Sequence, residues 1–270
     1  QYHSATGDPR VLDFMGRYFR YQLAQLPRTP LDNWTKWGRV RGGDNLAVVY
    51  WLYNLTGEKF LLELGELIHK QTFDWTGTFL HGDPLSRPYS LHCVDLGQGF
   101  KEPVVYWQQS GDSRHIEAVG RAVEKMRHTI GLPTGLWAGD EKLRFGDPTL
   151  GSELCTAVEM MFSLEQMMGI TGDVAFADRL ERVAFNALPT QVTDDFMYKQ
   201  YFQQPNQVMA TRHTRNFYED AVHAQTDVVF GTLSGFPCCY SNMHQGWPKF
   251  AQHLWFATPD NGVAALIYSP

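Results

Sequence analysis

Thr6-Gly7-Asp8, Thr56-Gly57-Glu58, Ser110-Gly111-Asp112 and Thr171-Gly172-Asp173 are four copies of one short turn. Their glycines lie 50, 54 and 61 residues apart, and periods of this length are typical of stacked supersecondary units. An amphipathic segment follows every copy, and an apolar, aromatic-rich segment precedes the last three. Glycine is suited to the end of one helix and an acidic residue to the start of the next. The sequence therefore predicts a repeated helical hairpin.

The two segments of each hairpin differ in character. The apolar ones predict inner helices at 46–55, 94–109 and 156–170, and the amphipathic ones predict outer helices at 10–26, 59–70, 114–128 and 175–188. This pattern indicates an all-α fold, an (α/α)6 toroid in which inner helices surround a central cleft. Long connections then gather over one mouth of the ring and carry the site; they cover 27–44, 72–92, 131–152 and 189–237.

Both ends of the chain suggest that the ring is incomplete. No inner helix precedes the first turn, so we expect the front of the toroid to be missing. Near the other end, residues 242–257 predict one more inner helix and 259–262 a turn. Residues 263–268 then predict a β-strand that has no partner strand in the sequence. We expect a partial barrel over 1–257 and the start of a truncated β domain over 258–270.

Composition excludes several classes of function. The 270 residues are 43% hydrophobic and 19% charged, with a net charge of −6 and no basic stripe, so neither nucleic-acid binding nor membrane insertion is indicated. The eight Trp, twelve Tyr and seventeen Phe suit a carbohydrate-facing cleft or an aromatic core. The start at Gln1 identifies no compartment; a periplasmic or secreted location is slightly favoured, and the oligomeric state stays open.

Two motifs hold three of the four cysteines. Cys238-Cys239 lies between a proline and an expected helix start at Asn242, while Gly151-Ser152-Glu153-Leu154-Cys155 enters an inner helix. The side chains of Glu153 and Cys155, two residues apart, point the same way only in an extended segment. If both bind one metal ion, they must therefore lie just before the first turn of the helix. If Glu153, Cys155, Cys238 and Cys239 meet, they form an S3O tetrahedral set for Zn2+. The alternatives are buried free cysteines or a strained vicinal disulfide.

Glu-x-Cys followed by Cys-Cys-x-x-Asn, on an α/α ring, resembles glycoside hydrolase family 127, the β-L-arabinofuranosidase family. Gly139-Asp140-Glu141 and the stretch His244-Gln245-Gly246-Trp247-Pro248-Lys249-Phe250 extend the resemblance over essentially the whole chain. It implies a zinc-dependent, retaining glycoside hydrolase that releases a small terminal sugar from a glycan. It also implies that 1–257 is a partial catalytic barrel and that 258–270 begins a β-sandwich.

The resemblance assigns roles to single residues. Cys238 matches the nucleophile, and Glu153, Cys155 and Cys239 match its fellow zinc ligands. Glu141 matches the general acid/base, with Asp140 as the alternative. His92, Glu181 and Tyr201 match residues that contact the sugar. Asp44, in Gly43-Asp44-Asn45, replaces a histidine of the founding branch, which predicts a changed sugar contact and leaves the substrate sugar open.

Ordinary structural roles compete with several of these assignments. His92 on an apolar helix also fits a core histidine, Glu181 fits a solvated ion pair with Arg179 or Arg182, and Tyr201 fits packing in a strand. Trp37, in a mouth loop, fits either stacking on a sugar or buried support.

A thiolate nucleophile is chemically coherent here, because retention needs a nucleophile and a proton donor on opposite faces of the anomeric carbon. Zinc supplies the charge that keeps a thiol ionised at neutral pH. Two other functions are alternatives. One is a non-catalytic carbohydrate-binding protein with a structural zinc, and the other is a different (α/α)6 enzyme such as a sugar epimerase or lyase, which works through His, Tyr or carboxylate bases.

Overall fold

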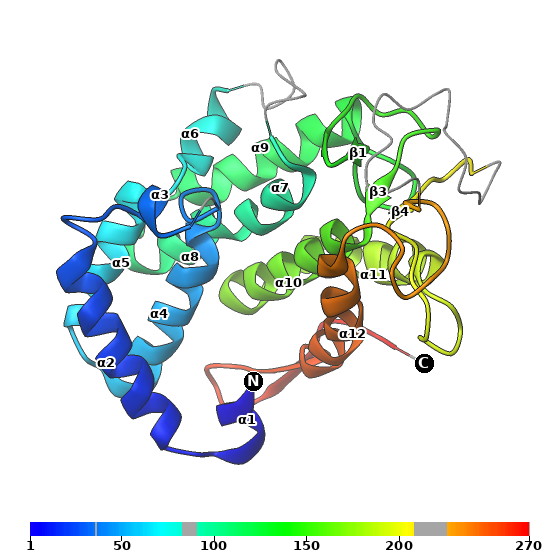
Figure 1. Cartoon of the computed structure of the whole chain (residues 1–270). Coiled ribbons are helices and arrows are strands. Elements are labelled where there is room, and N and C mark those ends of the chain that lie inside the picture. The colour runs from blue at the N-terminus through cyan, green and yellow to red at the C-terminus, as the bar shows by residue number, and fades with distance from the viewer. Residues whose placement is uncertain (36, 83–90, 208–225, 270) are drawn as a thin grey trace.

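The computed structural model describes residues 1–35, 37–82, 91–207 and 226–269. Its helices wind round an arc from the N-terminus to the C-terminal segment (Figure 1). The inner helices are α4 (Gly42–Thr56), α8 (Lys101–Ser110) and α10 (Leu154–Thr171), and the outer ones are α2 (Arg10–Gln25), α5 (Phe60–Gln71), α9 (Arg114–Thr129) and α11 (Val174–Asn186). The prediction of an all-α toroid of helical hairpins is confirmed. Shorter helices are α1 (Tyr2–Thr6), α3 (Leu31–Trp34) and α6 (Trp75–Leu80).

The repeated turn has one geometry in all four copies. Its glycines have φ values between 66° and 69°, which is the left-handed conformation that favours glycine. In Thr171-Gly172-Asp173, the Gly172 N–H donates to the Met168 carbonyl at 2.8 Å, and the Asp173 N–H donates to the Thr171 hydroxyl at 3.1 Å. The Asp173 carboxylate then accepts from the Ala175 N–H at 2.9 Å and begins α11. Each residue of the triplet therefore satisfies a backbone group that a helix end leaves free.

The inner helix predicted at 94–109 is two helices. The structure has α7 (Cys93–Gly99) and then α8, with the break at Phe100. Pro103 is the third residue of α8 and cannot donate a hydrogen bond to the carbonyl of Gly99, so one continuous helix is not possible here.

The last helix and the strand after it differ from the prediction. The helix α12 spans Pro237–Gln252, not 242–257, because Pro237 is well suited to a first helical position. Cys238 and Cys239 therefore lie in its first turn. A partnerless strand at 263–268 was also wrong, since β6 (Val263–Ala265) pairs antiparallel with β5 (Trp255–Ala257). The turn at 259–262 joins these strands, so the predicted domain boundary at 257/258 lies inside a hairpin.

A small sheet that the sequence did not reveal lies at the amino end of α10 (Figure 1). Its order is β2-β1-β3-β4. The strands are β1 (Gly139–Asp140), β2 (Lys142–Leu143), β3 (Ser152–Glu153) and β4 (Phe202–Gln203). A 3-10 turn, η2 (Leu188–Gln191), follows α11. The sheet joins the predicted mouth connections 131–152 and 189–237. Residues 208–225 of the second connection, and residues 83–90 of the connection 72–92, lie outside the described residues.

A membrane-spanning role finds no support among the described helices, none of which combines the necessary length and apolar character.

Candidate active site

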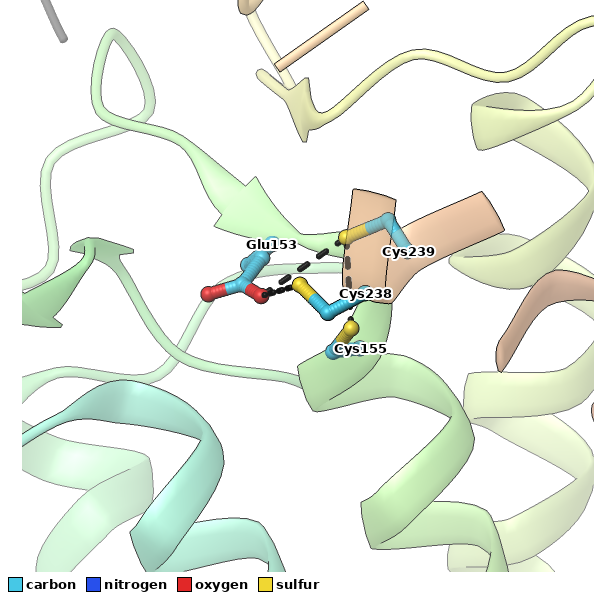
Figure 2. Close-up of side chains that lie close together, drawn as sticks. All are labelled: Glu153, Cys155, Cys238 and Cys239. Atoms are coloured by element: carbon cyan, nitrogen blue, oxygen red, sulfur yellow. Dashed lines mark hydrogen bonds between the residues drawn. The ribbon is translucent and has the colours of Figure 1, made fainter. Parts of the chain in front are cut away.

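The structure brings the Glu153, Cys155, Cys238 and Cys239 side chains together (Figure 2). Their ligand atoms all lie within 4.8 Å of one another. Glu153 is extended, with φ −69° and ψ 140°, and Cys155 lies in the first turn of α10. Cys239 is fully buried, while the Cys238 side chain is half-buried and faces the accessible side of the cluster. The predicted meeting of the four donors is thus observed, with Cys155 one step further into the helix than expected.

The distances in this cluster suit a tetrahedral metal ion. Cys238 Sγ and Cys239 Sγ each lie 3.6 Å from Glu153 Oε1, and Cys155 Sγ lies 3.3 Å from Cys239 Sγ. Zinc bond lengths give tetrahedral edges of about 3.5 Å between sulfur and oxygen and about 3.8 Å between sulfurs. The sulfur–oxygen edges already match, and the two sulfurs need to separate by about 0.5 Å. All four cysteines are free, so the vicinal disulfide alternative is wrong.

The charges of the cluster also point to a cation. Burial raises the pKa of Glu153 to about 8. The hydrogen bond that Cys155 donates to Cys238 raises the pKa of Cys155, and burial raises that of Cys239. Hydrogen bonds from Cys155 and Cys239 lower the pKa of Cys238. Without a metal ion, the protein therefore stabilises a thiolate only at Cys238. A dication would be needed to ionise all four donor groups.

Glu141 occupies a strained backbone position at the edge of this cluster. It forms the turn between β1 and β2 with φ 67°, a left-handed value that costs a non-glycine residue about 1 kcal/mol or more. Its carboxylate accepts hydrogen bonds from the Tyr201 hydroxyl at 2.6 Å and from His92 Nε2 at 3.0 Å. Asp140, the alternative acid/base, is buried and its carboxylate accepts from the Gly151 N–H at 3.0 Å. Glu141 therefore contacts Tyr201 and His92 beside the cluster, while Asp140 holds the backbone that precedes Glu153.

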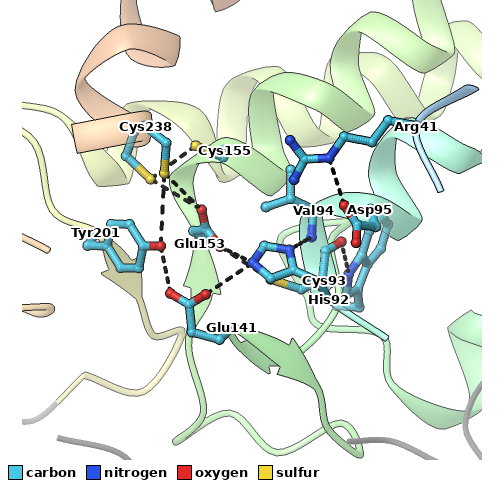
Figure 3. A network of polar contacts seen from close by, with 12 residues as sticks. Arg41, His92, Cys93, Val94, Asp95, Glu141, Glu153, Cys155, Tyr201 and Cys238 are labelled. Carbon is cyan, nitrogen blue, oxygen red and sulfur yellow. Dashed lines mark hydrogen bonds and ion pairs between the residues drawn. The ribbon is translucent and has the colours of Figure 1, made fainter. Parts of the chain in front are cut away.

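His92 links Glu141 to Glu153 of the cysteine–glutamate cluster (Figure 3). Its Nδ1 accepts from the Val94 N–H at 3.1 Å, which assigns the ring proton to Nε2. Nε2 also lies 3.8 Å from Glu153 Oε2. Burial opposes the charged imidazolium, but the hydrogen bond to Glu141 and the charges of Glu153 and Asp95 outweigh it, so the pKa of His92 is raised. A core-histidine role alone does not explain these carboxylate contacts.

Tyr201 lies between the two proposed reacting groups. Its side chain is buried, and its hydroxyl oxygen lies 2.6 Å from Glu141 Oε1 and 4.0 Å from Cys238 Sγ. Burial and the neighbouring negative charges raise the pKa of Tyr201, so the hydroxyl keeps its proton and donates to Glu141.

A partly exposed aromatic and cationic pair borders His92. The Trp37 ring centroid lies 5.5 Å from that of His92, and the Arg41 guanidinium lies 4.7 Å from the Trp37 ring centroid. Arg41 Nε donates to Asp95 at 2.8 Å (Figure 3). Sequence reasoning found Trp37 but missed Arg41 and Asp95, although Asp95 lies in the first turn of α7, directly after the N-cap residue His92.

Two predicted sugar contacts are not brought into this group. Asp44, in the first turn of α4, forms a 2.5 Å ion pair with the fully buried Lys101. Glu181 lies on the outer helix α11 and accepts a hydrogen bond from the Tyr268 N–H at 3.1 Å, which places it on the outer wall. The remaining cysteine, Cys93, is buried, and its sulfur contacts Glu153 Oε2 at 3.5 Å.

Comparison with known proteins places this arrangement in a family. Residues 1–252 match the family model described as β-L-arabinofuranosidase, GH127 catalytic domain. A search of curated proteins found no match.

Three solved structures are similar to the chain. A glycoside hydrolase aligns with TM-score 0.70 and 15% identity over 98% of this chain and 46% of its own. A GH127 β-L-arabinofuranosidase from Geobacillus stearothermophilus T6 aligns with TM-score 0.68 and 18% identity over 96% and 44%. A further GH127 β-arabinofuranosidase aligns with TM-score 0.53 and 17% identity over 78% and 32%. The chain thus spans less than half the length of each, and the likeness shows a common fold.

The family match covers every residue of the Glu141, Glu153, Cys155, Cys238 and Cys239 group. The resemblance seen in the sequence is therefore confirmed, and the chain belongs to the β-L-arabinofuranosidase catalytic domains of family GH127.

Proposed function

We propose that the chain is the catalytic part of a zinc-dependent, retaining glycoside hydrolase of β-L-arabinofuranosidase type. One observation carries the proposal: Tyr201 contacts both the Glu141 carboxylate and the Cys238 sulfur. At 2.6 Å and 4.0 Å, these contacts limit the separation of the two groups to about 6.6 Å. The separation of about 5–5.5 Å found in retaining glycosidases lies within this upper limit, whereas nearly all of the inverting range of about 6.5–9.5 Å lies beyond it.

The cluster fits zinc, with Glu153, Cys155, Cys238 and Cys239 as the ligands. Bound zinc would supply the positive charge that keeps these thiols ionised. Glu153, Cys155 and Cys239 are the buried members of the cluster and would serve to hold the zinc ion in place. Cys238 is the half-buried one, so its sulfur is the member that a sugar can reach.

The reaction would proceed in two displacements. In the first, the Cys238 sulfur forms a bond to the anomeric carbon while the glycosidic carbon–oxygen bond breaks, and Glu141 gives its proton to the leaving oxygen. In the second, Glu141 takes a proton from water, the water oxygen bonds to the anomeric carbon, and the carbon–sulfur bond breaks. His92 Nε2, 3.0 Å from Glu141, holds this carboxylate in position and is suitably placed to exchange a proton with it.

A single set of assays tests this function. The chain is incubated with an aryl β-L-arabinofuranoside, bound zinc is counted by elemental analysis, and the anomer of the first product is identified by proton NMR. We expect release of arabinose with retained configuration. Cys238→Ala should lower turnover by a factor of 1,000 or more, on the order of the loss of a catalytic nucleophile. Ser241→Ala, an exposed change on the same helix, is the control. Normal turnover by the Cys238 variant with zinc bound would rule out the nucleophile assignment.

A further inference from the structure

A cavity lies on the outer wall of the ring, between two outer helices. It has a volume of about 470 Å3 and is enclosed by α9, by the loop at 131–136 and by α11. Its charged lining consists of Glu124, Arg127, Asp178, Arg179 and Arg182. None of its lining residues belongs to the candidate active site, so the cavity requires an explanation of its own.

The three arginines of this cavity lack counter-ions. Within the described part of the chain, no carboxylate oxygen lies within 4.0 Å of a guanidinium nitrogen of Arg127, Arg179 or Arg182, and no side chain accepts a hydrogen bond from them. Exposed arginines elsewhere on α2 and α9 each have a carboxylate within 2.8 Å: Arg10, Arg17, Arg114 and Arg121. The cavity arginines therefore differ from these paired arginines of α2 and α9.

Arg179 is the least exposed of the three and the most affected by its surroundings. Burial lowers the pKa of Arg179, and the charges of Arg182 and Arg127 lower it further, while Glu124 acts in the opposite direction. Three like charges around one cavity repel each other, and a half-buried cation without a counter-ion is costly. An anion bound in the cavity would relieve both effects.

The backbone around the cavity holds the arginines in place. Arg179 and Arg182 are three residues apart and share one face of α11. Gly135 has φ 91°, and a Cβ atom there would lie 3.0 Å from Arg182 Cγ. The loop can therefore run close against the Arg182 stem only because this position is glycine. This fit packs the loop closely against the stem of Arg182.

The mixed charges of the lining indicate the chemistry of the ligand. Arginines bind carboxylates through paired hydrogen bonds. The Glu124 and Asp178 carboxylates also line the cavity and offer acceptors for hydroxyl groups. A ligand that satisfies both needs one carboxylate and several hydroxyls, and the volume suits a small ligand of sugar size. We propose that this cavity binds a uronic-acid unit of an acidic glycan, apart from the site of hydrolysis.

Calorimetric titration of the chain with sodium D-glucuronate tests this proposal. D-glucose and sodium acetate are the matched probes, since each lacks one half of the predicted recognition. We expect glucuronate to bind at least about tenfold more tightly than either probe, and its affinity to fall as salt rises from about 0.05 M to about 0.5 M. Equal affinity for acetate and glucuronate would overturn the proposal, because it would indicate a simple anion site.

Substitutions locate the binding. Arg179→Gln and the more exposed Arg182→Gln should each weaken glucuronate binding at least about tenfold, as expected for the loss of a charged hydrogen-bonded pair. Arg121→Gln, on α9 but paired with Glu117 outside the cavity, should leave the affinity unchanged. Cys238→Ala should also bind glucuronate normally. Binding that survives both cavity substitutions, or that disappears with Cys238→Ala, would show that the sugar acid binds elsewhere and would refute the inference.

Discussion

The hydroxyl of Tyr201 donates a 2.6 Å hydrogen bond to the carboxylate of Glu141. The two residues are 60 positions apart in the sequence and meet because Tyr201 precedes β4 while Glu141 follows β1 in the same sheet. A neutral donor at this distance stabilises the charged form of the carboxylate. The small sheet therefore controls both the position and the protonation of the proposed acid/base.

Replacement of Tyr201 by Phe removes this donor while keeping the ring. We expect kcat to fall by about 10- to 100-fold, because Glu141 loses one of its two observed hydrogen-bond donors, with a smaller change in KM. The alkaline limb of the pH–rate profile should shift to higher pH, because Glu141 must be protonated to act as the acid and then keeps its proton more readily. Tyr198→Phe, an exposed change three residues away, is the control. An unchanged profile would mean that Tyr201 only fills space.

Replacement of Glu153 by Gln tests the metal site independently of turnover. The variant keeps the shape of the side chain but removes the only carboxylate among the four donors. We expect zinc affinity to fall by at least about tenfold, measured by competition with a chromophoric chelator. Zinc should also raise the melting temperature of the original chain more than that of the variant. Glu117→Gln on the exposed face of α9 should behave like the original, and identical zinc binding by all three proteins would contradict the ligand assignment.

The repeated turn offers a test with two glycines of opposite effect. Gly57 has φ 69° and Gly120 lies inside α9, and an added Cβ would meet no atom within 4 Å at either position. Gly57→Ala should lower the free energy of unfolding by about 1 kcal/mol, because alanine is strained at this φ. Gly120→Ala should raise it by about 0.5–1 kcal/mol. Chemical denaturation measures both, and equal changes would contradict the role of the turn.

A pH-dependent contribution to stability is expected from His253. Its Nδ1 lies 2.7 Å from the Lys249 carbonyl and 3.2 Å from an oxygen of the fully buried Glu165, the second contact being an ion pair rather than a hydrogen bond. Burial opposes the charged ring, but Glu165 outweighs it and the pKa of His253 is raised. The stabilisation is therefore complete below the unfolded pKa of about 6.5 and is lost as pH rises through the folded pKa.

His253→Gln should accordingly lower the melting temperature most near pH 5.5–6, with a smaller effect near pH 9, where the ring is neutral in both states. Calorimetry at several pH values gives the comparison. His128→Gln, at an exposed ring 3.9 Å from Glu124, is the matched control for the removal of an imidazole. A larger loss at pH 9 than at pH 6 would reverse the expected sign.

The regular part of the fold could be predicted because its signals are local. The Gly57 and Gly172 turns specify where each helix ends, and the predicted outer helices agree with α2, α5, α9 and α11 to within about two residues. The start of α12 was misplaced because a proline followed by two cysteines was interpreted as a loop. Proline is favoured at the first position of a helix, and Pro237 indeed begins α12.

The site was predictable only where residue chemistry was distinctive. The thiols of Cys155, Cys238 and Cys239 prefer soft metals, and zinc also accepts a carboxylate such as that of Glu153. Their meeting could therefore be inferred without knowledge of the path of the chain. Arg41 and Asp95 gave no such signal, since a buried ion pair depends on tertiary proximity. The four-stranded sheet was missed because strands of two residues show no periodicity. Glu181 resembles the family pattern, yet the structure directs it to the outer wall.

The Cys238–Glu153 contact joins residues separated by 85 positions. Each local segment holds only two of the four donors, so assembly of the complete set must follow the docking of α12 onto α10 during folding. A cross-link between such distant points removes more disorder from the unfolded chain than one between neighbours. Catalytic competence and the final stage of folding would then depend on the same four atoms, and the concentration of available metal would govern both.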